Sequence, residues 1–424
     1  MPRMIFSFCL CVITVSTLFL PATSRDTDFD VQPFRVNLAH EVPHMKALIQ
    51  NTRLPGTTLY PAADIEFGIR LDFLRDLQMK WLNDFDWTKQ EAALNKVPHF
   101  TAKIEGLTVH FVHARSKEPD RIPLLMMHGW PGSFQEFLPV IKPLTKLWKS
   151  PTGKRISFDV IVPSLPGFLF SSPPPQNWTT NDTARIFNTL MVNVLGYSTY
   201  ALHGTDRGSV IGYTLYSAFN TSVRAANLKS IPFVAPTPDD IAANNITLSD
   251  IAKVTEQRTA DNRATGQGYF TEQTFKPNTI GLALYDNPIG QLAWIGGNIQ
   301  LWSDPRAGTP PSVLTDETLL TMVSLYYLTQ TFQSSVWLYA QNPNTFSPNY
   351  LKPATDAPLV FSLFEFDIML WPREYVERAS NLVLYKGPSL TSGQEHDFGG
   401  HFAGLDNPPA LIEDLHDLGV YFEP

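Results

Sequence analysis

A single aspartate, Asp206, lies between two glycines in the stretch LHGTDRGSVIGYTLY, residues 202–216. The apolar run before Asp206 is typical of a buried strand, and the pattern after it is typical of a helix. Gly204 and Gly208 would permit a strained turn, at which the N-terminus of the helix favours an ionised carboxylate. Two interpretations are open. Asp206 is a nucleophile held at the turn, or it only caps the helix.

Two further loops carry groups that a nucleophilic carboxylate would need. HGWPGS, residues 128–133, would offer the backbone N–H of Trp130, together with that of Arg207, to a developing oxyanion. GGHFAGLDNP, residues 399–408, places His401 late in the chain, just before the last expected helix, where such sites keep their base. The alternatives are a Gly-Pro loop without function and an unremarkable histidine, since the chain has 10 histidines.

A third group, a carboxylate between nucleophile and base in chain order, would orient the histidine. The run PLVFSLFEFD, residues 358–367, offers both Glu365 and Asp367. Side chains two positions apart share one face of a strand, so the periodicity does not choose between them.

The elements that would position these residues follow an alternating pattern. Short apolar runs that each end at a glycine are expected to be buried strands, at residues 122–129, 157–167 and 197–204. Helical patterns such as residues 183–196 separate them. This predicts an α/β protein with a mostly parallel sheet, covered on both faces, whose binding residues gather at the carboxyl ends of the strands. Later strands are expected at residues 358–366 and 381–387, and a final helix at 408–422.

Five segments are expected along the chain. They are a signal peptide or anchor (1–24), an N-terminal segment (25–120), the first part of the core (121–230), a helical cap (231–350) and the second part of the core (351–424). The apolar run near the N-terminus predicts a cleaved signal and a secreted protein. An uncleaved anchor in the endoplasmic reticulum membrane is the alternative.

Secretion has two consequences for the chemistry of the chain. Both cysteines, Cys9 and Cys11, lie in the apolar run, so the cleaved protein would have neither a disulfide nor a thiol. Asn-x-Ser/Thr sequences that would accept glycans during secretion occur at Asn177, Asn181, Asn220 and Asn245.

Composition and charge exclude several classes of function. The formal net charge is −8 and the 32 basic residues are spread thinly, so nucleic acid is not an expected partner. The 43% hydrophobic content and the 28 phenylalanines suit a large core and an apolar pocket. Neither a metal-ligand spacing nor a dinucleotide glycine fingerprint occurs, so we expect no cofactor and no metal. The oligomeric state is left open.

From about residue 30 onward the sequence resembles the microsomal-type epoxide hydrolases, which include juvenile-hormone and fungal members. The resemblance rests on FDWTKQEAALNKVPHFTAKIEGLTVHFVHARS (85–116), HGWPGS, the Asp206 turn, the cap and GGHFA. It implies the α/β-hydrolase fold with a helical cap insertion and an N-terminal extension.

The resemblance also implies roles for individual residues. Asp206 matches the family's nucleophile, His401 its base and Asp367 the acid that orients the base. Tyr269 and Tyr339 match two cap tyrosines that hold and protonate the epoxide oxygen. The implied reaction converts an apolar epoxide and water to a vicinal diol through an aspartyl ester.

The turn departs from the family pattern, in which Gly-Gly-Asp is followed by an apolar residue. Here Thr205 precedes the nucleophile and Arg207 follows it. A guanidinium folded back onto Asp206 would blunt its attack, whereas one directed elsewhere would permit turnover.

Three rival functions are open. The first is a weakened or inactive homologue that acts as a secreted hydrophobic-ligand binding protein. The second is a haloalkane dehalogenase, a class in which a tryptophan follows the nucleophile, where this chain has Arg207. The third is a serine esterase, but Ser209 lies beyond the apex of the turn.

Overall fold

The computed structural model describes residues 29–60, 67–387 and 396–424. The expected signal peptide or anchor, residues 1–24, therefore lies outside the described residues. Within the part of the chain that is described, no helix combines the length and apolarity needed to cross a membrane.

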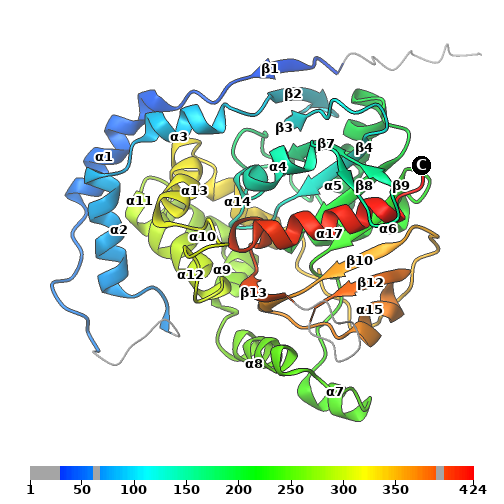
Figure 1. Ribbon diagram of the computed structural model, residues 1–424. Coiled ribbons are helices and arrows are strands. Elements are labelled where there is room, and N and C mark those ends of the chain that lie inside the picture. Colours follow the sequence, from blue (N-terminus) through cyan, green and yellow to red (C-terminus); the bar gives the residue numbers. More distant parts are fainter. Residues whose placement is uncertain (1–28, 61–66, 388–395) are drawn as a thin grey trace, which may run out of the picture.

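A central sheet of nine strands organises the molecule (Figure 1). In spatial order its strands are β1 (Gln32–Phe34), β2 (His99–Ile104), β3 (Leu107–Ala114), β7 (Phe158–Pro163), β4 (Ile122–Met127), β8 (Tyr200–Gly204), β9 (Val223–Leu228), β10 (Leu359–Ser362) and β12 (Leu382–Lys386). The strands from β7 to β12 pair in parallel, and β1, β2, β3 and β7 pair antiparallel. The prediction of a mostly parallel sheet is confirmed.

The apolar runs of the sequence form the centre of this sheet. Every residue of β7 and β8 is buried, and so is all of β4 except Pro123. Strands without an exposed face are covered on both sides, which is why these runs are continuous rather than alternating. The carboxyl ends of β4 and β8 adjoin, because Met127 pairs with Gly204. The loops that follow these strands therefore begin side by side.

Helices of the core flank the sheet. They are α4 (Leu138–Leu144), α5 (Thr180–Thr189), α6 (Asp206–Ala218), α15 (Arg373–Ala379), α16 (Ala403–Asp406) and α17 (Pro408–Tyr421). Helix α4 packs against α17, and α5 packs against α6. The expected helix at residues 183–196 is α5 and the π-helical turn Leu190–Val194 that continues it.

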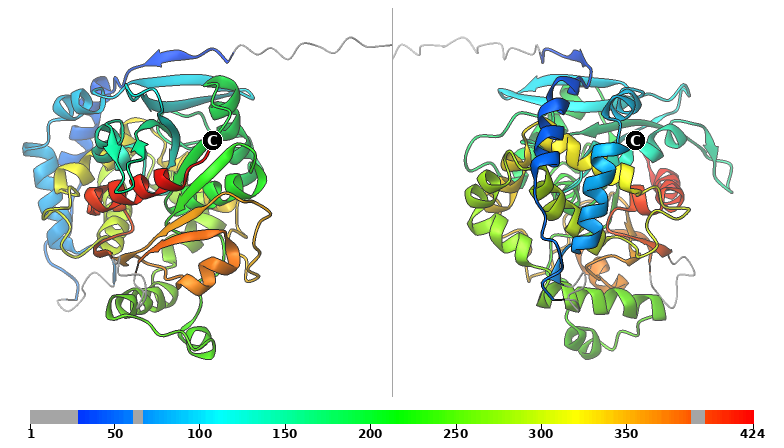
Figure 2. Two further views of the ribbon diagram at one scale, coloured as in Figure 1. Left: turned by 45° about the vertical axis from the view of Figure 1, so that its right-hand side comes forward. Right: turned by 90° about the vertical axis from the view of Figure 1, so that its left-hand side faces the viewer.

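Between β9 and β10 the chain forms a run of helices. They are α7 (Pro238–Ala243), α8 (Asp250–Ala264), α9 (Gly268–Phe275), α10 (Pro277–Ala283), α11 (Pro288–Gln291), α12 (Gly297–Trp302), α13 (Asp316–Leu328) and α14 (Phe332–Ala340). The N-terminal helices are α1 (Val42–Asn51), α2 (Leu71–Asn83) and α3 (Trp87–Leu94). Helix α1 packs on α11 and α13, and α2 packs on α13, so the N-terminal segment braces this helical layer (Figure 2).

Two features of the topology differ from the sequence-based expectation. Strand β9 was not predicted, because VRAANL mixes an arginine and an asparagine into a short run. The expected strand at residues 358–366 is two strands that break at Leu363, with β10 in the main sheet. Its second part, β11 (Phe364–Phe366), pairs with β13 (His396–Gly400) in a separate small sheet. A further small sheet pairs β5 (Trp148–Lys149) with β6 (Arg155–Ile156).

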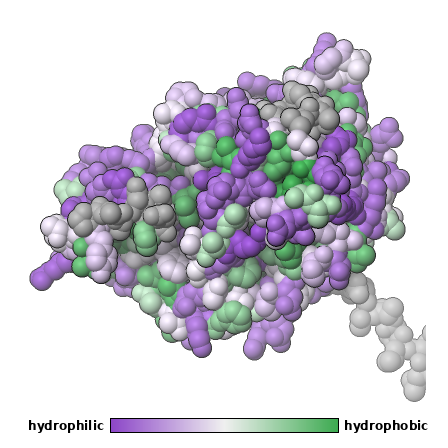
Figure 3. Space-filling view, turned by 90° about the horizontal axis from the view of Figure 1, so that it is seen from below, coloured by the Kyte–Doolittle hydropathy of each residue, from purple (hydrophilic) through white to green (hydrophobic). Residues whose placement is uncertain are grey.

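The surface on the side of α7 and α8 is mixed in character. Figure 3 shows this side from below, with hydrophobic residues in small areas between hydrophilic ones. Such a mixture of hydrophobic and hydrophilic areas is ordinary on the surface of a globular protein.

Candidate active site

Asp206 begins α6 immediately after β8 and occupies a strained backbone conformation. Its φ is +49°, in the left-handed region that side chains other than glycine seldom adopt. The turn is tight because α6 passes close to the loop after β4. A Cβ on Gly208 would lie 2.1 Å from the carbonyl oxygen of Met127, so only glycine fits at that position. The strain holds the Asp206 carboxylate at the carboxyl edge of the sheet.

Backbone N–H groups cradle the Asp206 carboxylate. The N–H of Trp130 donates to Oδ1 at 2.9 Å, and the N–H of Arg207 also bonds the carboxylate. Gly129 permits this approach, since a Cβ there would lie 2.0 Å from Oδ1. Burial raises the pKa of Asp206, but the close contact with His401 and the charge of its ring outweigh this effect and hold the pKa below its usual value. The nucleophile candidate is therefore ionised at neutral pH.

His401 lies between two carboxylates. Its Nε2 is 3.4 Å from Oδ2 of Asp206, and its Nδ1 is 3.2 Å from Oδ1 of Asp367. The contact with Asp206 is an ion-pair distance without hydrogen-bond geometry, so Nε2 has no hydrogen-bond partner. Burial would lower the pKa of His401, but its close contacts with the carboxylates of Asp206 and Asp367, and their negative charges, raise it to about 9.

The structure distinguishes between the two acid candidates. Asp367 is buried against His401 and accepts a hydrogen bond from the N–H of Ile368 at 2.9 Å. Glu365 instead lies 3.4 Å from the guanidinium of Arg306 and makes no contact with the histidine. The chain leaves β11 after Phe366, so the two side chains do not share one strand face as the alternation had suggested.

The two predicted tyrosines come from neighbouring helices of the helical layer. Tyr269 is on α9 and Tyr339 is on α14, and their ring centroids are 5.8 Å apart. Trp130 stacks on Tyr269, with ring centroids 5.5 Å apart. Burial raises the pKa of both phenols, and the charge of Asp206 raises it further, so both keep their protons at neutral pH.

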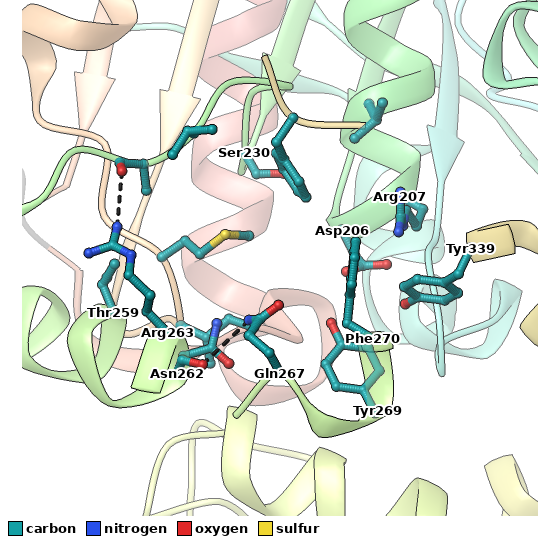
Figure 4. Close-up of a pocket in the computed structure, with 16 residues that line it drawn as sticks. Asp206, Arg207, Ser230, Thr259, Asn262, Arg263, Gln267, Tyr269, Phe270 and Tyr339 are labelled. Atoms are coloured by element: carbon teal, nitrogen blue, oxygen red, sulfur yellow. Dashed lines mark hydrogen bonds between the residues drawn. The ribbon is translucent and has the colours of Figure 1, made fainter. Parts of the chain in front are cut away.

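These groups meet at a cavity of about 290 Å³. Asp206, Arg207, Tyr269 and Tyr339 line it together with mostly apolar side chains, among them Val210, Val234, Phe270, Phe346, Ile368 and Met369. Figure 4 shows Asp206 and both tyrosines at one end of the cavity, with Arg263 and Asn262 at the other. Within the described residues, no cluster of histidine, cysteine or carboxylate side chains could hold a metal ion.

The Arg207 side chain turns away from the nucleophile. It donates through Nη1 to the hydroxyl of Thr345, and its guanidinium carbon lies 4.2 Å from the Tyr339 ring centroid. None of the ion pairs within the described residues includes Arg207, so the guanidinium is not clamped across Asp206. Of the two orientations considered from the sequence, the structure has the one in which the guanidinium is directed elsewhere, toward Thr345 and Tyr339.

The sequence did not indicate Lys229, which follows β9 and supports the histidine and its acid. Its Nζ lies 3.1 Å from Oδ2 of Asp367 and donates to the carbonyls of Gly400 at 2.8 Å and His401 at 2.9 Å. Trp302 adds a second support, because its carbonyl accepts from the N–H of His401 and its ring packs against the imidazole. No motif marks either residue, so only the fold reveals them.

Three of the four expected glycan acceptors are exposed, namely Asn177, Asn181 and Asn245. Asn220 is partly buried, and its side-chain amide donates to the carbonyl of Ala354 at 2.9 Å.

Comparisons with known proteins were made by sequence and by structure. The family model for the epoxide hydrolase N terminus matches residues 31–137, and the model for the alpha/beta hydrolase fold matches residues 122–248. Epoxide hydrolase 1 of Sus scrofa is 30% identical over 418 residues, which cover 93% of this chain and 89% of that protein. Juvenile hormone epoxide hydrolase 2 of Ctenocephalides felis is 29% identical over 427 residues, covering 95% and 88%.

Solved structures agree with the sequence matches. The structure of the Aspergillus niger epoxide hydrolase aligns with a TM-score of 0.78 and 32% identity, covering 93% of this chain and 97% of that one. The juvenile hormone epoxide hydrolase of Bombyx mori aligns with a TM-score of 0.80 at 23% identity, covering 94% and 96%, which shows a shared fold. The predicted resemblance and the predicted α/β-hydrolase fold are confirmed.

Proposed function

The chain belongs to the epoxide hydrolase family, and on that premise we propose that it hydrolyses epoxides through a covalent ester of Asp206. In the first step an Asp206 oxygen forms a bond to one oxirane carbon while the bond from that carbon to the ring oxygen breaks. The ring oxygen leaves as an alkoxide and takes a proton from Tyr269 or Tyr339. The tyrosines are suited to this role because both phenols are protonated and both line the cavity beside Asp206.

In the second step His401 acts as the base. A water gives its proton to Nε2 while its oxygen attacks the ester carbonyl of Asp206. The N–H groups of Trp130 and Arg207, which bond the carboxylate in the resting enzyme, stabilise the oxyanion. The tetrahedral intermediate then collapses to the Asp206 carboxylate and the diol. Of the two water protons, one completes the new hydroxyl of the diol and the other, taken up by His401, returns to the tyrosinate left by the first step. Asp367 keeps Nδ1 of His401 as the donor, so that Nε2 faces the ester.

One observation carries this proposal. The Asp206 carboxylate lies between the Trp130 N–H at 2.9 Å and the His401 ring at 3.4 Å, at the end of a cavity that two phenols line. A helix cap would need neither the histidine nor the phenols. The mostly apolar lining of the cavity supports an epoxide whose body is apolar.

The test is a single turnover with styrene oxide in water enriched in heavy oxygen. If an ester forms, the attacking water leaves its oxygen in Asp206, and mass spectrometry of the peptide finds the label there. Asp206→Ala should abolish diol formation, and Asp239→Ala, on the surface of α7, should not. Diol without label in Asp206 would disprove the ester, and binding without diol would favour the hydrophobic-ligand binding protein.

Secretion and glycosylation are a second part of the proposal. The exposure of Asn177, Asn181 and Asn245 supports glycan attachment at these positions. Treatment of the protein from its native host with peptide N-glycosidase should lower its apparent mass. An unchanged mass would count against passage through the secretory route.

A further inference from the structure

The side chain of Arg207 is a buried cation with an unused donor at the nucleophile end of the cavity. Arg207 is 5% exposed, and its Nη1 donates to Thr345. Its guanidinium carbon lies 4.2 Å from the Tyr339 ring centroid and 5.3 Å from that of Phe270. Its Nη2 is buried and has no hydrogen-bond partner. A buried cation with an N–H that lacks a partner is costly unless a ligand supplies one.

The charges that line the cavity favour an anion. Asp206, Arg207 and Arg263 are the charged residues of its lining within the described chain, so the cations outnumber the anions. Arg263 lies at the far end and donates to the carbonyl of Ala235 at 3.0 Å. Formation of the ester would neutralise Asp206 and increase the excess of positive charge. The cation near the reacting carbon is therefore Arg207.

We propose that Arg207 binds a carboxylate of the substrate, and that the preferred substrates are epoxides with a carboxylate on the oxirane ring or one carbon away from it. This inference rests on the proposed ester mechanism, because it places the oxirane between Asp206 and the tyrosines. Arg207 follows the nucleophile directly and covers the face of Tyr339, so a group bound at Nη2 lies next to the oxirane. The apolar remainder of the substrate would occupy the Phe346, Ile368 and Met369 side of the cavity.

The carboxylate takes no part in the bond changes. Asp206 still bonds to carbon, the ring oxygen still takes the tyrosine proton, and the second oxygen of the diol still comes from Asp206, which water replenishes when it hydrolyses the ester. Arg207 offsets the repulsion between the substrate carboxylate and the Asp206 carboxylate, which would otherwise oppose binding. An apolar residue at this position could not do so.

A rival role for Arg207 is to strengthen the tyrosine acids for every substrate. Its positive charge acts to lower the pKa of both phenols. This role predicts an equal loss of rate for charged and neutral epoxides when the cation is removed. A carboxylate site predicts a loss for the charged substrate alone.

The experiment compares 3-phenylglycidate, its primary amide and styrene oxide as substrates. We expect kcat/KM for the glycidate to exceed that for the amide by ~10-fold or more, the scale of a charge-assisted hydrogen bond. Arg207→Met should reduce this ratio by ~10-fold or more, and Arg207→Lys should keep part of it. Arg373→Met, the same charge change on the surface of α15, should leave the ratio unchanged. If Arg207→Met leaves the ratio of kcat/KM for the glycidate to that for the amide unchanged, the proposal is overturned. The same holds if the variant slows all three substrates equally, because the ratio is then unchanged.

A second measurement needs no variant at position 207. Against hydrolysis of styrene oxide by the unmodified enzyme, 3-phenylpropanoate should inhibit ~10-fold more strongly than 3-phenylpropanamide. Equal inhibition would overturn the carboxylate site. Neither result bears on the ester itself, because labelling of Asp206 with styrene oxide tests that step separately.

Discussion

The charge state of His401 depends on whether its neighbour Asp206 is charged. In the resting site two carboxylates flank the imidazole and raise its pKa to about 9, a value that suits an ion pair better than a base at neutral pH. Ester formation removes the negative charge of Asp206. The pKa of His401 should then fall, which frees Nε2 to take a proton from water in the second step. In the proposed mechanism, the charge of Asp206 thus controls when His401 becomes available as a base.

Asp206→Asn mimics the uncharged ester and should lower the pKa of His401 below about 9. NMR titration of the His401 ring protons in the two proteins measures the difference. A His128→Asn protein, which lacks a different buried histidine, helps to assign the signals. If His401 titrates at the same pH with and without the Asp206 charge, the coupling is absent and the argument fails.

The sequence predicted a nucleophile, a base and an acid-bearing strand, and the structure brings Asp206, His401 and Asp367 together, but strand periodicity could not choose between Glu365 and Asp367. Motifs are local, whereas the choice depends on where the chain leaves β11 and on which carboxylate Lys229 reaches. Arg207 is a similar case. The sequence showed an unusual residue, and only the fold shows that Thr345 and Tyr339 hold it away from Asp206.

Asp367→Asn should slow hydrolysis of the ester by ~100-fold or more, because an amide can neither stabilise the imidazolium nor keep its orientation. Alkylation of Asp206 should continue, so the ester should accumulate. Rapid-quench mass spectrometry of the Asp206 peptide follows both steps. Glu365→Gln is the matched control, two residues away, and should leave ester hydrolysis close to the wild-type rate. A large effect from Glu365→Gln would reverse the assignment of the acid.

At the scale of elements, the site depends on strands that the sequence did not predict. Strand β9 is fully buried except at Arg224, although it contains asparagine. Asn227 is satisfied there by His203 at 2.6 Å and by the hydroxyl of Ser362 at 2.8 Å. Such a strand has no hydrophobic signal of its own, because its polar groups find partners only after the sheet has formed. Lys229, which follows strand β9, is thereby placed beside Asp367.

Lys229→Met should lower the free energy of unfolding by about 3 kcal/mol, because it leaves the buried Asp367 charge and two loop carbonyls without their partner. Ester hydrolysis should slow as well, since the His401 loop loses its tether. Urea unfolding measures the first effect. Lys253→Met removes an exposed lysine paired with Asp250 on α8 and should cost less than about 1 kcal/mol. Equal losses in the two variants would show that Lys229 does not support the site.

At the scale of the whole molecule, the prediction from sequence was better for the core than for the helical layer. The core strands are continuous apolar runs, and those runs require burial on both faces. The helices between β9 and β10 have no equivalent signal, since two of them, α11 and α13, pack against the N-terminal helices α1 and α2, which lie far away in the sequence. The same long-range packing brings α9 and α14 together, and with them the two tyrosines. Spacing alone could not have paired Tyr269 with Tyr339.

The stability of the whole molecule should depend on a buried acid beside the site, Glu136. Burial raises its pKa to about 8 from an ordinary value of 4.5, so between these values the folded protein holds a proton that the unfolded chain releases. The stability that Glu136 contributes is therefore full below about pH 4.5 and is lost as the pH rises through 8. Glu136→Gln cannot ionise, so its free energy of unfolding relative to wild type should improve by on the order of 3 kcal/mol between pH 5 and pH 9. Urea unfolding at the two pH values measures this change. Glu317 is an exposed partner of Lys89, and Glu317→Gln should differ from wild type by the same free energy of unfolding at both pH values. If the free-energy difference between Glu136→Gln and wild type does not change with pH, Glu136 is ionised in the folded protein.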